Sequence, residues 1–238
     1  MTPHTIASLG TILGVWAHPD DESYLSAGLM AMASAAGHHV AVVHATLGEH
    51  GTPDPVAMPP DRLGELRRHE LARALTIVGA AEHHQLDHPD GGCQDSDLNL
   101  ATEAIERIIE KVAPDTIVTF GPDGMTGHPD HRAVSAWTTH AWRRTGRRAR
   151  LLFAAVTTDW ATEHRALNAR LGAFPSGWPL AVAPDAVALR LVLSEAVLDT
   201  KLAALSAHRS QTTPLVEAAG AEAYRRWWST ETFVEQTT

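Results

Sequence analysis

Short apolar runs alternate with amphipathic segments along most of the chain. Six segments are predicted as strands, five of them apolar runs and one, Glu82–Asp87, only short. They are Ile12–Ala17, His39–Thr46, Glu82–Asp87, Asp115–Phe120, Leu151–Thr157 and Val187–Leu193. Most of the remaining segments predict helices. These are Ser26–Gly37, Asp61–Gly79, Leu98–Val112, the segment after His131, Glu195–His208 and Glu217–Trp228. The alternation predicts an α/β protein, a Rossmann-like three-layer sandwich around a mostly parallel sheet. Residues 159–184 have no assignable pattern.

The first apolar run ends in a turn rich in metal-ligand side chains. His18, Asp20, Asp21 and Glu22 follow the strand closely, and Pro19 stiffens the turn between them. In open parallel α/β sheets, ligands bind at the carboxyl ends of the strands. Packing this much charge at a strand end is costly unless a cation neutralises it. The turn therefore predicts half of a zinc site.

A second turn of the same kind, His128-Pro129-Asp130-His131, follows the strand Asp115–Phe120. Catalytic zinc typically has three protein ligands and a fourth position for water. His18, Asp21 and His131 supply such a set from two strand ends. We therefore predict one zinc ion per chain at the carboxyl ends of the strands.

The remaining polar residues of the two turns have expected catalytic roles. Asp20 is left as the general base that takes a proton from water. His128 is expected to stabilise an oxyanion or protonate a leaving nitrogen, and Asp130 to orient an imidazole. A third run, His88-Pro89-Asp90, lacks the additional ligand and predicts only a turn.

Two charged residues interrupt the apolar face of the clearest amphipathic helix, Asp61–Gly79. Arg67 and Glu70 fall inside this face at about 100° per residue. They have the spacing of a buried ion pair. Alternatively, they point into a polar cavity in which Arg67 holds a substrate oxygen. The sequence leaves both interpretations open.

Composition narrows the class of protein. The 238 residues include fifteen histidines and carry a formal charge of −9, which argues against nucleic acid or an anionic membrane as partner. The single cysteine, Cys93, excludes Cys-rich zinc sites and has no local support as a nucleophile. No glycine-rich nucleotide-binding motif follows a strand. The short first apolar run, with no basic stretch before it, predicts neither a signal peptide nor a membrane span, and hence a cytoplasmic protein.

The two motif-bearing turns resemble those of the PIG-L/LmbE-like family of zinc-dependent N-deacetylases, over roughly residues 12 to 212. The resemblance rests on five segments. These are Ala17-His18-Pro19-Asp20-Asp21-Glu22, Thr46-Leu47-Gly48-Glu49-His50-Gly51, the Arg67-x-x-Glu70-Leu71 helix, Gly127-His128-Pro129-Asp130-His131, and Lys201 through His208-Arg209-Ser210-Gln211. The resemblance implies that His18, Asp21 and His131 bind the metal, that Asp20 is the base and that His128 stabilises the intermediate. It also implies a single LmbE-like domain over residues 1–238.

The resemblance also implies substrate contacts and a substrate class. Arg67, Glu49 and His208 are the expected substrate-binding residues. Thr126 stands where some members carry a tyrosine, so no tyrosine oxyanion donor is expected there. The expected reaction is removal of an acetyl group from an N-acetylglucosamine-type sugar or conjugate. An amidase of sugar–cysteine conjugates and a non-catalytic sugar- or metal-binding protein are the alternatives. The oligomeric state is left open.

Overall fold

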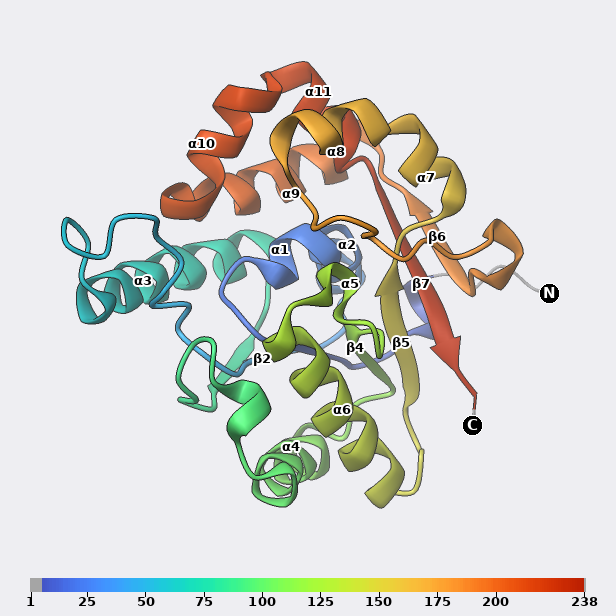
Figure 1. The fold of residues 1–238 in the computed structure, drawn as a ribbon. Coiled ribbons are helices and arrows are strands. Elements are labelled where there is room, and N and C mark those ends of the chain that lie inside the picture. The colour runs from blue at the N-terminus through green and yellow to red at the C-terminus, as the bar shows by residue number, and fades with distance from the viewer. Residues whose placement is uncertain (1–5, 238) are drawn as a thin grey trace.

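The computed structural model describes residues 6–237 and places seven strands in one sheet (Figure 1). Their order across the sheet is β3-β2-β1-β4-β5-β7-β6. The strands are β1 (Ile12–Trp16), β2 (Val40–His44), β3 (Glu82–Gln85), β4 (Thr116–Phe120), β5 (Arg150–Ala155), β6 (Leu189–Val192) and β7 (Thr230–Gln236). The first five run parallel, whereas β7 pairs antiparallel with both β5 and β6. The expected mostly parallel sheet is confirmed.

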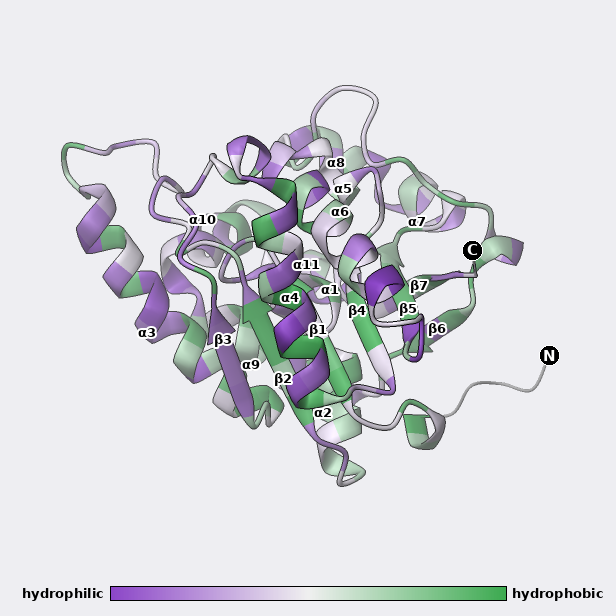
Figure 2. Cartoon of the chain, turned by 90° about the horizontal axis from the view of Figure 1, so that it is seen from below, coloured by the Kyte–Doolittle hydropathy of each residue, from purple (hydrophilic) through white to green (hydrophobic). Residues whose placement is uncertain are grey.

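The central strands are apolar because both of their faces are covered. Every residue of β1, β2 and β4 is buried, as expected for a parallel sheet between two helical layers. Figure 2 shows these strands as mainly hydrophobic, whereas β3 at the edge is hydrophilic. The hydrophobic core therefore lies around the strands whose ends carry the predicted ligands.

Two groups of long helices form the outer layers (Figure 1). One group consists of α2 (Ala27–Ala35), α3 (Pro60–Val78) and α9 (Glu195–Ala207), and the other of α4 (Leu98–Val112) and α6 (Pro129–Arg144). The other helices lie mainly toward the carboxyl ends of the parallel strands (Figure 1). They are α1 (Asp21–Leu25), α5 (Gly124–Gly127), α7 (Thr158–Glu163), α8 (Arg165–Leu171), α10 (Arg209–Ala219) and α11 (Ala221–Trp227). Three further short 3₁₀ helices are Ile6–Ser8, Cys93–Asp95 and Pro184–Ala186.

The differences from the sequence prediction lie mostly in the second half of the chain. The expected helix Glu217–Trp228 is correct only in part, because α10 begins earlier and the chain breaks at Gly220, which has a φ of 82°. The unassigned segment 159–184 contains most of α7 and all of α8. Strand β7 was not predicted, because most of its residues are polar and it contains no apolar run.

None of the helices within residues 6–237 combines the length and the apolarity that crossing a bilayer requires.

Candidate metal centre and active site

Two adjacent strands bring the three predicted ligands together. His18 follows β1, and Asp21 is the first residue of α1. His131 lies in the first turn of α6, which follows the loop after β4. Because β1 and β4 are hydrogen-bonded neighbours, their carboxyl ends lie side by side. The expected convergence of these residues, 113 positions apart at the extremes, is present in the structure.

The distances between the three donor groups fit one metal ion. His18 Nδ1 lies 3.1 Å from His131 Nε2. Asp21 Oδ2 lies 3.5 Å from His18 Nδ1, and Asp21 Oδ1 lies 3.4 Å from His131 Nε2. Ligand atoms at about 2.0–2.1 Å from a tetrahedral zinc are separated by about 3.3 Å. The three groups therefore have the spacing of three corners of a zinc coordination shell.

Hydrogen bonds on the outer sides of the imidazoles determine where their protons lie. The Nδ1 of His131 is 3.0 Å from the Gly124 carbonyl oxygen, which only accepts. The Nε2 of His18 is 3.2 Å from Asp130 Oδ2 and 3.1 Å from Asp90 Oδ1. In the neutral rings, with protons on these outer nitrogens, the inner nitrogens present lone pairs to each other and to Asp21. Three converging electron pairs repel one another unless a cation lies between them.

The electrostatics of the cluster favour positive charge at its centre. Burial lowers the pKa of His18, but Asp130, Asp21 and Asp90 outweigh it and raise that pKa well above its usual value. Burial raises the pKa of Asp21, but His131 and His18 bring it down to about 2. Burial lowers the pKa of His131 to about 4, against the opposing effect of Asp21. Asp21 is thus ionised and His131 neutral, which are the forms that bind metals, whereas the raised pKa of His18 means that this ring releases its inner proton when a metal binds.

Asp130 supports His18 from behind. Its side chain is fully buried, and it accepts hydrogen bonds from the backbone N–H groups of Gly91 (2.7 Å) and Cys93 (3.0 Å). A carboxylate fixed in this way holds the His18 ring in one orientation and tautomer. Burial raises the pKa of the Cys93 thiol, and Asp130 raises it further, so this side chain remains protonated.

Asp90 is part of the site, although the sequence analysis gave its His-Pro-Asp run no role beyond a turn. Its Oδ1 is 3.1 Å from His18 Nε2, and its Oδ2 accepts a hydrogen bond from the His50 backbone N–H at 2.8 Å. The Asp90 backbone N–H donates to Glu49 Oε1 at 2.9 Å. The prediction that His88-Pro89-Asp90 forms only a turn is therefore incomplete. This run repeats the motif of the two site turns, and that repetition could have indicated its contact with His18.

Asp20 lies beside the ligands in a conformation unusual for a residue other than glycine. Its φ is 117° and its ψ is −27°, and its backbone N–H donates to Glu22 Oε2 at 2.9 Å. The carboxylate is half-buried and accepts a hydrogen bond from Arg67 Nη2 at 3.1 Å. Burial outweighs the opposing effect of Arg67 and raises the pKa of Asp20 to about 6. A carboxylate with this pKa is suited to accept a proton near neutral pH.

The structure separates the two charged residues of α3. Arg67 is buried and donates to the carbonyl oxygens of Gly48 (2.8 Å) and Pro19, as well as to Asp20. In the described part of the chain, Glu70 bonds instead to the backbone N–H and hydroxyl of Ser210, at 2.8 and 2.6 Å. The alternative of an Arg67–Glu70 ion pair is therefore wrong.

Glu22 faces away from the predicted ligands and into the protein. It is fully buried, and its carboxylate is 3.0 Å from His44 Nε2 and 2.9 Å from His208 Nε2. Burial raises the pKa of Glu22, but His208 and His44 outweigh it and hold that pKa well below its usual value. His208 is also fully buried, so the structure places it against Glu22 instead of at a surface open to substrate.

His128 lies at the exposed rim of the site. Its Nδ1 accepts a hydrogen bond from the Asp130 backbone N–H at 3.2 Å, at the start of α6. Its ring centroid lies 4.9 Å from that of His18 and 5.0 Å from that of His131. Desolvation and the neighbouring His18 lower the pKa of His128, which favours the neutral ring. Since Nδ1 accepts, a neutral ring carries its proton on Nε2.

His128 is also near enough to be considered as a ligand. One nitrogen from each of His18, His128 and His131 lies within 4.8 Å of the others. The Asp21 carboxylate faces both inner nitrogens, with Oδ2 at 3.5 Å from His18 Nδ1 and Oδ1 at 3.4 Å from His131 Nε2, whereas His128 Nδ1 already accepts from the Asp130 backbone N–H. We therefore retain Asp21 in the ligand set and treat His128 as a residue beside it.

This site consists of two imidazoles, a carboxylate between them and a second carboxylate nearby, all at the strand ends of an α/β sheet. Such a site is characteristic of metal-dependent hydrolases. The sequence model of the PIG-L family, described as GlcNAc-PI de-N-acetylase, matches residues 13–142. The chain belongs to this family of metal-dependent deacetylases and is an amide hydrolase of the N-deacetylase type.

Individual relatives agree with this assignment. The 1D-myo-inositol 2-acetamido-2-deoxy-alpha-D-glucopyranoside deacetylase of Saccharomonospora viridis is 35% identical, and the match covers 85% of each chain. The N,N'-diacetylchitobiose deacetylase of Pyrococcus horikoshii has a TM-score of 0.69 at 19% identity, covering 97% of this chain and 85% of that one. The zinc-inhibited form of a teicoplanin deacetylase has a TM-score of 0.67 at 16% identity, covering 94% and 97%. The two structural likenesses confirm the fold.

Proposed function

We propose that this protein is a zinc-dependent hydrolase that removes the N-acetyl group from an N-acetylglucosamine-type sugar or its conjugate. The observation that carries the proposal is the convergence of lone pairs from His18, Asp21 and His131, with Asp20 beside them. The relative from Saccharomonospora viridis, named for its action on an acetamido-glucopyranoside of inositol, supports the substrate class. We also propose a single domain, because one sheet contains strands from both ends of the described chain.

His18, Asp21 and His131 would hold one zinc ion. Two imidazole nitrogens and one carboxylate oxygen form a set typical of catalytic zinc, which keeps a further position for water or substrate. When bound, zinc polarises a carbonyl oxygen and lowers the pKa of water to about 7. Asp130 and Asp90 hold the His18 ring so that Nδ1 faces this position.

Asp20 is the proposed general base. It accepts a proton from the water molecule that attacks the amide carbonyl carbon, and its pKa of about 6 leaves it ionised at neutral pH. Breaking of the C–N bond then requires a proton on the departing nitrogen, which Asp20 returns. The products are a carboxylate and a free amine.

His128 is the proposed donor to the developing oxyanion. Because its Nδ1 is occupied by the Asp130 backbone N–H, its Nε2–H is the group available to an oxygen in the site. One preorganised donor of this kind contributes about 100- to 1,000-fold to the rate.

Arg67 and Glu49 are the proposed residues on the sugar side of the site. Glu49 Oε2 is buried without a hydrogen-bond partner among the described residues, so a sugar hydroxyl that reached it would satisfy an unpaired acceptor. Arg67 would act mainly through Asp20, since its terminal nitrogens already bind Gly48, Pro19 and Asp20. His208 would support Glu22 and would not contact substrate.

A direct test follows acetate release from a panel of N-acetylglucosamine derivatives by zinc-loaded protein. The Asp20→Asn variant should lower kcat by about 100- to 10,000-fold while keeping one zinc per chain. Asp54→Asn, an exposed change in the loop before α3, serves as the matched control and should retain the wild-type rate. A wild-type rate in Asp20→Asn would exclude this base, and no acetate release from any sugar by the wild-type protein would exclude the substrate class.

A further inference from the structure

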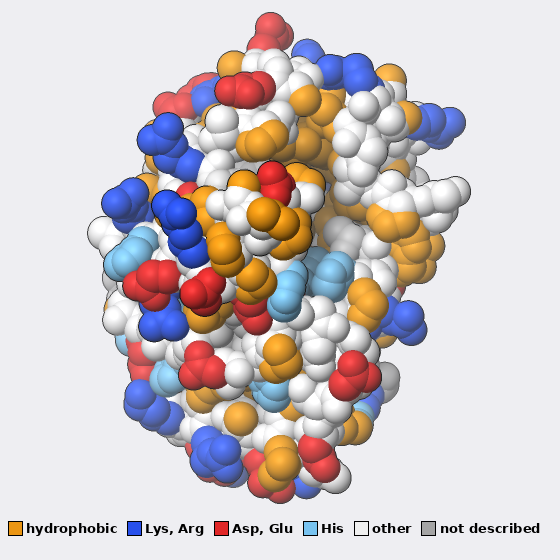
Figure 3. All heavy atoms as spheres, turned by 60° about the vertical axis from the view of Figure 1, so that its left-hand side comes forward, with side chains coloured by type: hydrophobic (Ala, Val, Ile, Leu, Met, Phe, Trp, Pro, Cys, Tyr) orange, Lys and Arg blue, Asp and Glu red, His pale blue; other side chains and the backbone are white. Residues whose placement is uncertain are grey.

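An apolar cavity of about 320 Å³ opens directly beside the candidate metal ligands. Asp21, Thr126 and His131 contribute to its wall. The rest of its wall is largely hydrophobic and includes Met125, Leu171, Phe174, Leu215, Trp227 and Trp228. In Figure 3, hydrophobic side chains line a hollow next to histidine side chains. The cavity therefore continues from the reacting centre into an apolar environment.

The wall of the cavity is built from packed aromatic side chains. The ring centroids of Trp227 and Trp228 are 4.8 Å apart, and those of Tyr24 and Trp228 are 4.7 Å apart. Trp227 is only 1% exposed, so this part of the wall is anchored in the protein. A pre-formed apolar pocket with few polar groups is the usual form of a site that binds an apolar ligand group.

Apart from Asp21, Thr126 and His131, the polar residues described in the site do not line this cavity. Asp20, Glu49, Arg67, Asp90 and His128 are all absent from its wall. An amide substrate has two parts that must lie in different directions from the carbonyl carbon, the acyl group and the sugar that carries the nitrogen. Burying sugar hydroxyls in an apolar cavity without partners is costly. The sugar is therefore accommodated on the polar side, and the cavity is left for the acyl group.

The volume of the cavity exceeds what an acetyl group needs. An apolar cavity of about 150 Å³ in another protein is large enough to bind benzene. The cavity beside Asp21 and His131 has about twice that volume, whereas the acetyl group contributes only one methyl. An acetyl group alone would leave most of this apolar wall without contacts.

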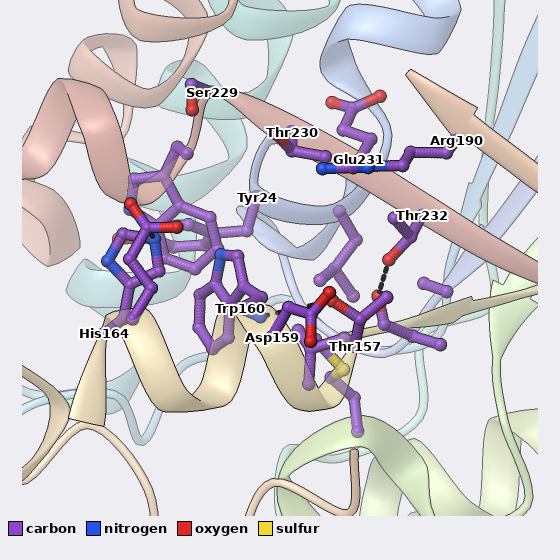
Figure 4. Close-up of a pocket in the computed structure, with 17 residues that line it drawn as sticks. Tyr24, Thr157, Asp159, Trp160, His164, Arg190, Ser229, Thr230, Glu231 and Thr232 are labelled. Carbon is purple, nitrogen blue, oxygen red and sulfur yellow. Dashed lines mark hydrogen bonds and ion pairs between the residues drawn. The ribbon is translucent and has the colours of Figure 1, made fainter. Parts of the chain in front are cut away.

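A second, smaller cavity sets a limit to the apolar one. It has a volume of about 90 Å³ and shares Tyr24, Leu25, Met125 and Trp228 with the first. Figure 4 shows the polar side chains of its wall, among them Thr157, Asp159, Thr230, Glu231 and Thr232. Because these groups would lose hydration against a hydrocarbon chain, a chain in the apolar cavity is not expected to extend past this wall.

We propose that the apolar cavity binds the acyl part of the substrate, and that this enzyme prefers N-acyl sugars with acyl groups longer than acetyl, of about hexanoyl length. The inference rests on the proposed function and adds to it the class of acyl group. No covalent step changes, because the same amide bond is hydrolysed and the product is a longer carboxylate.

The test compares N-acetyl-, N-butanoyl-, N-hexanoyl- and N-dodecanoylglucosamine with zinc-loaded enzyme. Each methylene buried in the cavity should raise kcat/KM by about fourfold, so hexanoyl should exceed acetyl by at least about tenfold. The gain should stop before dodecanoyl. Octyl N-acetylglucosaminide is included to place an apolar group on the sugar instead of the acyl side.

Two variants fill the cavity from different elements. Ala173→Trp and Leu215→Phe should each lower the hexanoyl-to-acetyl ratio of kcat/KM by about tenfold through lost space for methylenes. The matched control is Ala169→Trp, an exposed position on α8 that does not line the cavity, and it should leave the ratio unchanged. Two variants are used because either one alone could fold poorly.

Binding provides a readout that does not depend on turnover. Hexanoate should quench tryptophan fluorescence of the wild-type protein at lower concentration than acetate does, and this difference should be lost in both variants. The inference would be overturned if kcat/KM were equal for the acetyl and hexanoyl substrates and if acetate and hexanoate bound equally well. The proposed deacetylase function would not be affected by that result. A gain only with the octyl glycoside would overturn the acyl assignment. Absence of all hydrolysis, with hexanoate still preferred, would overturn the proposed function alone.

Discussion

Asp20 is the residue on which the site geometry depends most directly. A residue other than glycine at a φ of 117° stores strain of about 1–3 kcal/mol, so surrounding contacts must hold it. Two such contacts are visible. Glu22 accepts from the Asp20 backbone N–H, and Arg67 binds both the Asp20 carboxylate and the Pro19 carbonyl oxygen. The carboxylate is therefore placed by its neighbours rather than by its own preferred conformation.

This arrangement predicts the kinetic effect of removing Arg67. Arg67→Ala should lower kcat by about tenfold or more, because Asp20 loses both orientation and its charged partner, and KM should change less. Gly48→Ala should act in the same direction, since a Cβ on Gly48 would lie 2.2 Å from Arg67 Nη1. Steady-state kinetics with one acetylated sugar measure both parameters.

Arg68→Ala is the control, because Arg68 lies on the same helix but is exposed. If Arg67→Ala raises KM and leaves kcat unchanged, Arg67 contacts the substrate directly and does not act through Asp20.

Asp130 gives a second prediction at this scale. Asp130→Asn keeps the shape of the side chain but weakens the hydrogen bond to His18 Nε2. Zinc affinity should fall by about 10- to 100-fold, as measured by competition with a chromophoric chelator. Asp95→Asn, an exposed change in the same loop region as Cys93, should leave affinity unchanged. Equal affinities of Asp130→Asn and wild type would remove Asp130 from the support of the metal site.

Among the secondary-structure elements, the parallel strands could be predicted from the sequence and the last strand could not. Strands β1 and β4 are short apolar runs followed by His-Pro-Asp turns, and this pattern was sufficient to predict that the two turns meet at one edge of the sheet. The orientation of Glu22 and the contact of Asp90 with His18 depend on packing between distant segments. A pattern in one stretch of sequence cannot specify such contacts. The polar strand β7 could not be predicted for the same reason, because its extended conformation depends on pairing with β5 and β6.

A buried ion pair joins β7 to two helices. Lys201 on α9 lies 2.8 Å from Glu231 on β7, and Glu231 also accepts from the backbone N–H groups of Gly28 and Leu29 at the start of α2. Both side chains of the pair are almost completely buried. Lys201→Met should lower the free energy of unfolding by about 3–5 kcal/mol, because it leaves a buried carboxylate without its cation.

Urea denaturation measures this loss. Arg225 provides the contrast, because it pairs with Glu195 and Asp199 at the surface, and Arg225→Met should change stability little. If Lys201→Met and Arg225→Met lower the free energy of unfolding by similar amounts, burial does not determine how much these ion pairs contribute to stability.

At the scale of the whole molecule, the metal ligands connect segments that are far apart in sequence. A zinc ion held by His18, Asp21 and His131 would link the turn after β1 to the start of α6. An ion bound only by the folded state, at about 1,000 times its Kd, adds about 4 kcal/mol of stability. Dialysis against a chelator should therefore lower the Tm by about 10 °C, and added zinc should restore it.

His131→Ala supplies the control for this prediction, since it should make the Tm insensitive to zinc. His69→Ala, an exposed histidine on α3, should respond to zinc as the wild-type protein does. A chelator-insensitive Tm in the wild-type protein would show that the site does not bind a stabilising ion.

The position of β7 between β5 and β6 affects the order of events during synthesis. A nascent chain that has already emerged through residue 207 contains every proposed zinc ligand and most of the sheet, yet β5 has an unpaired edge and β6 has no neighbour. Open strand edges of this kind pair readily with other chains. We therefore expect the ribosome-bound protein to be most prone to aggregation before β7 is released from the exit tunnel and joins the two strands.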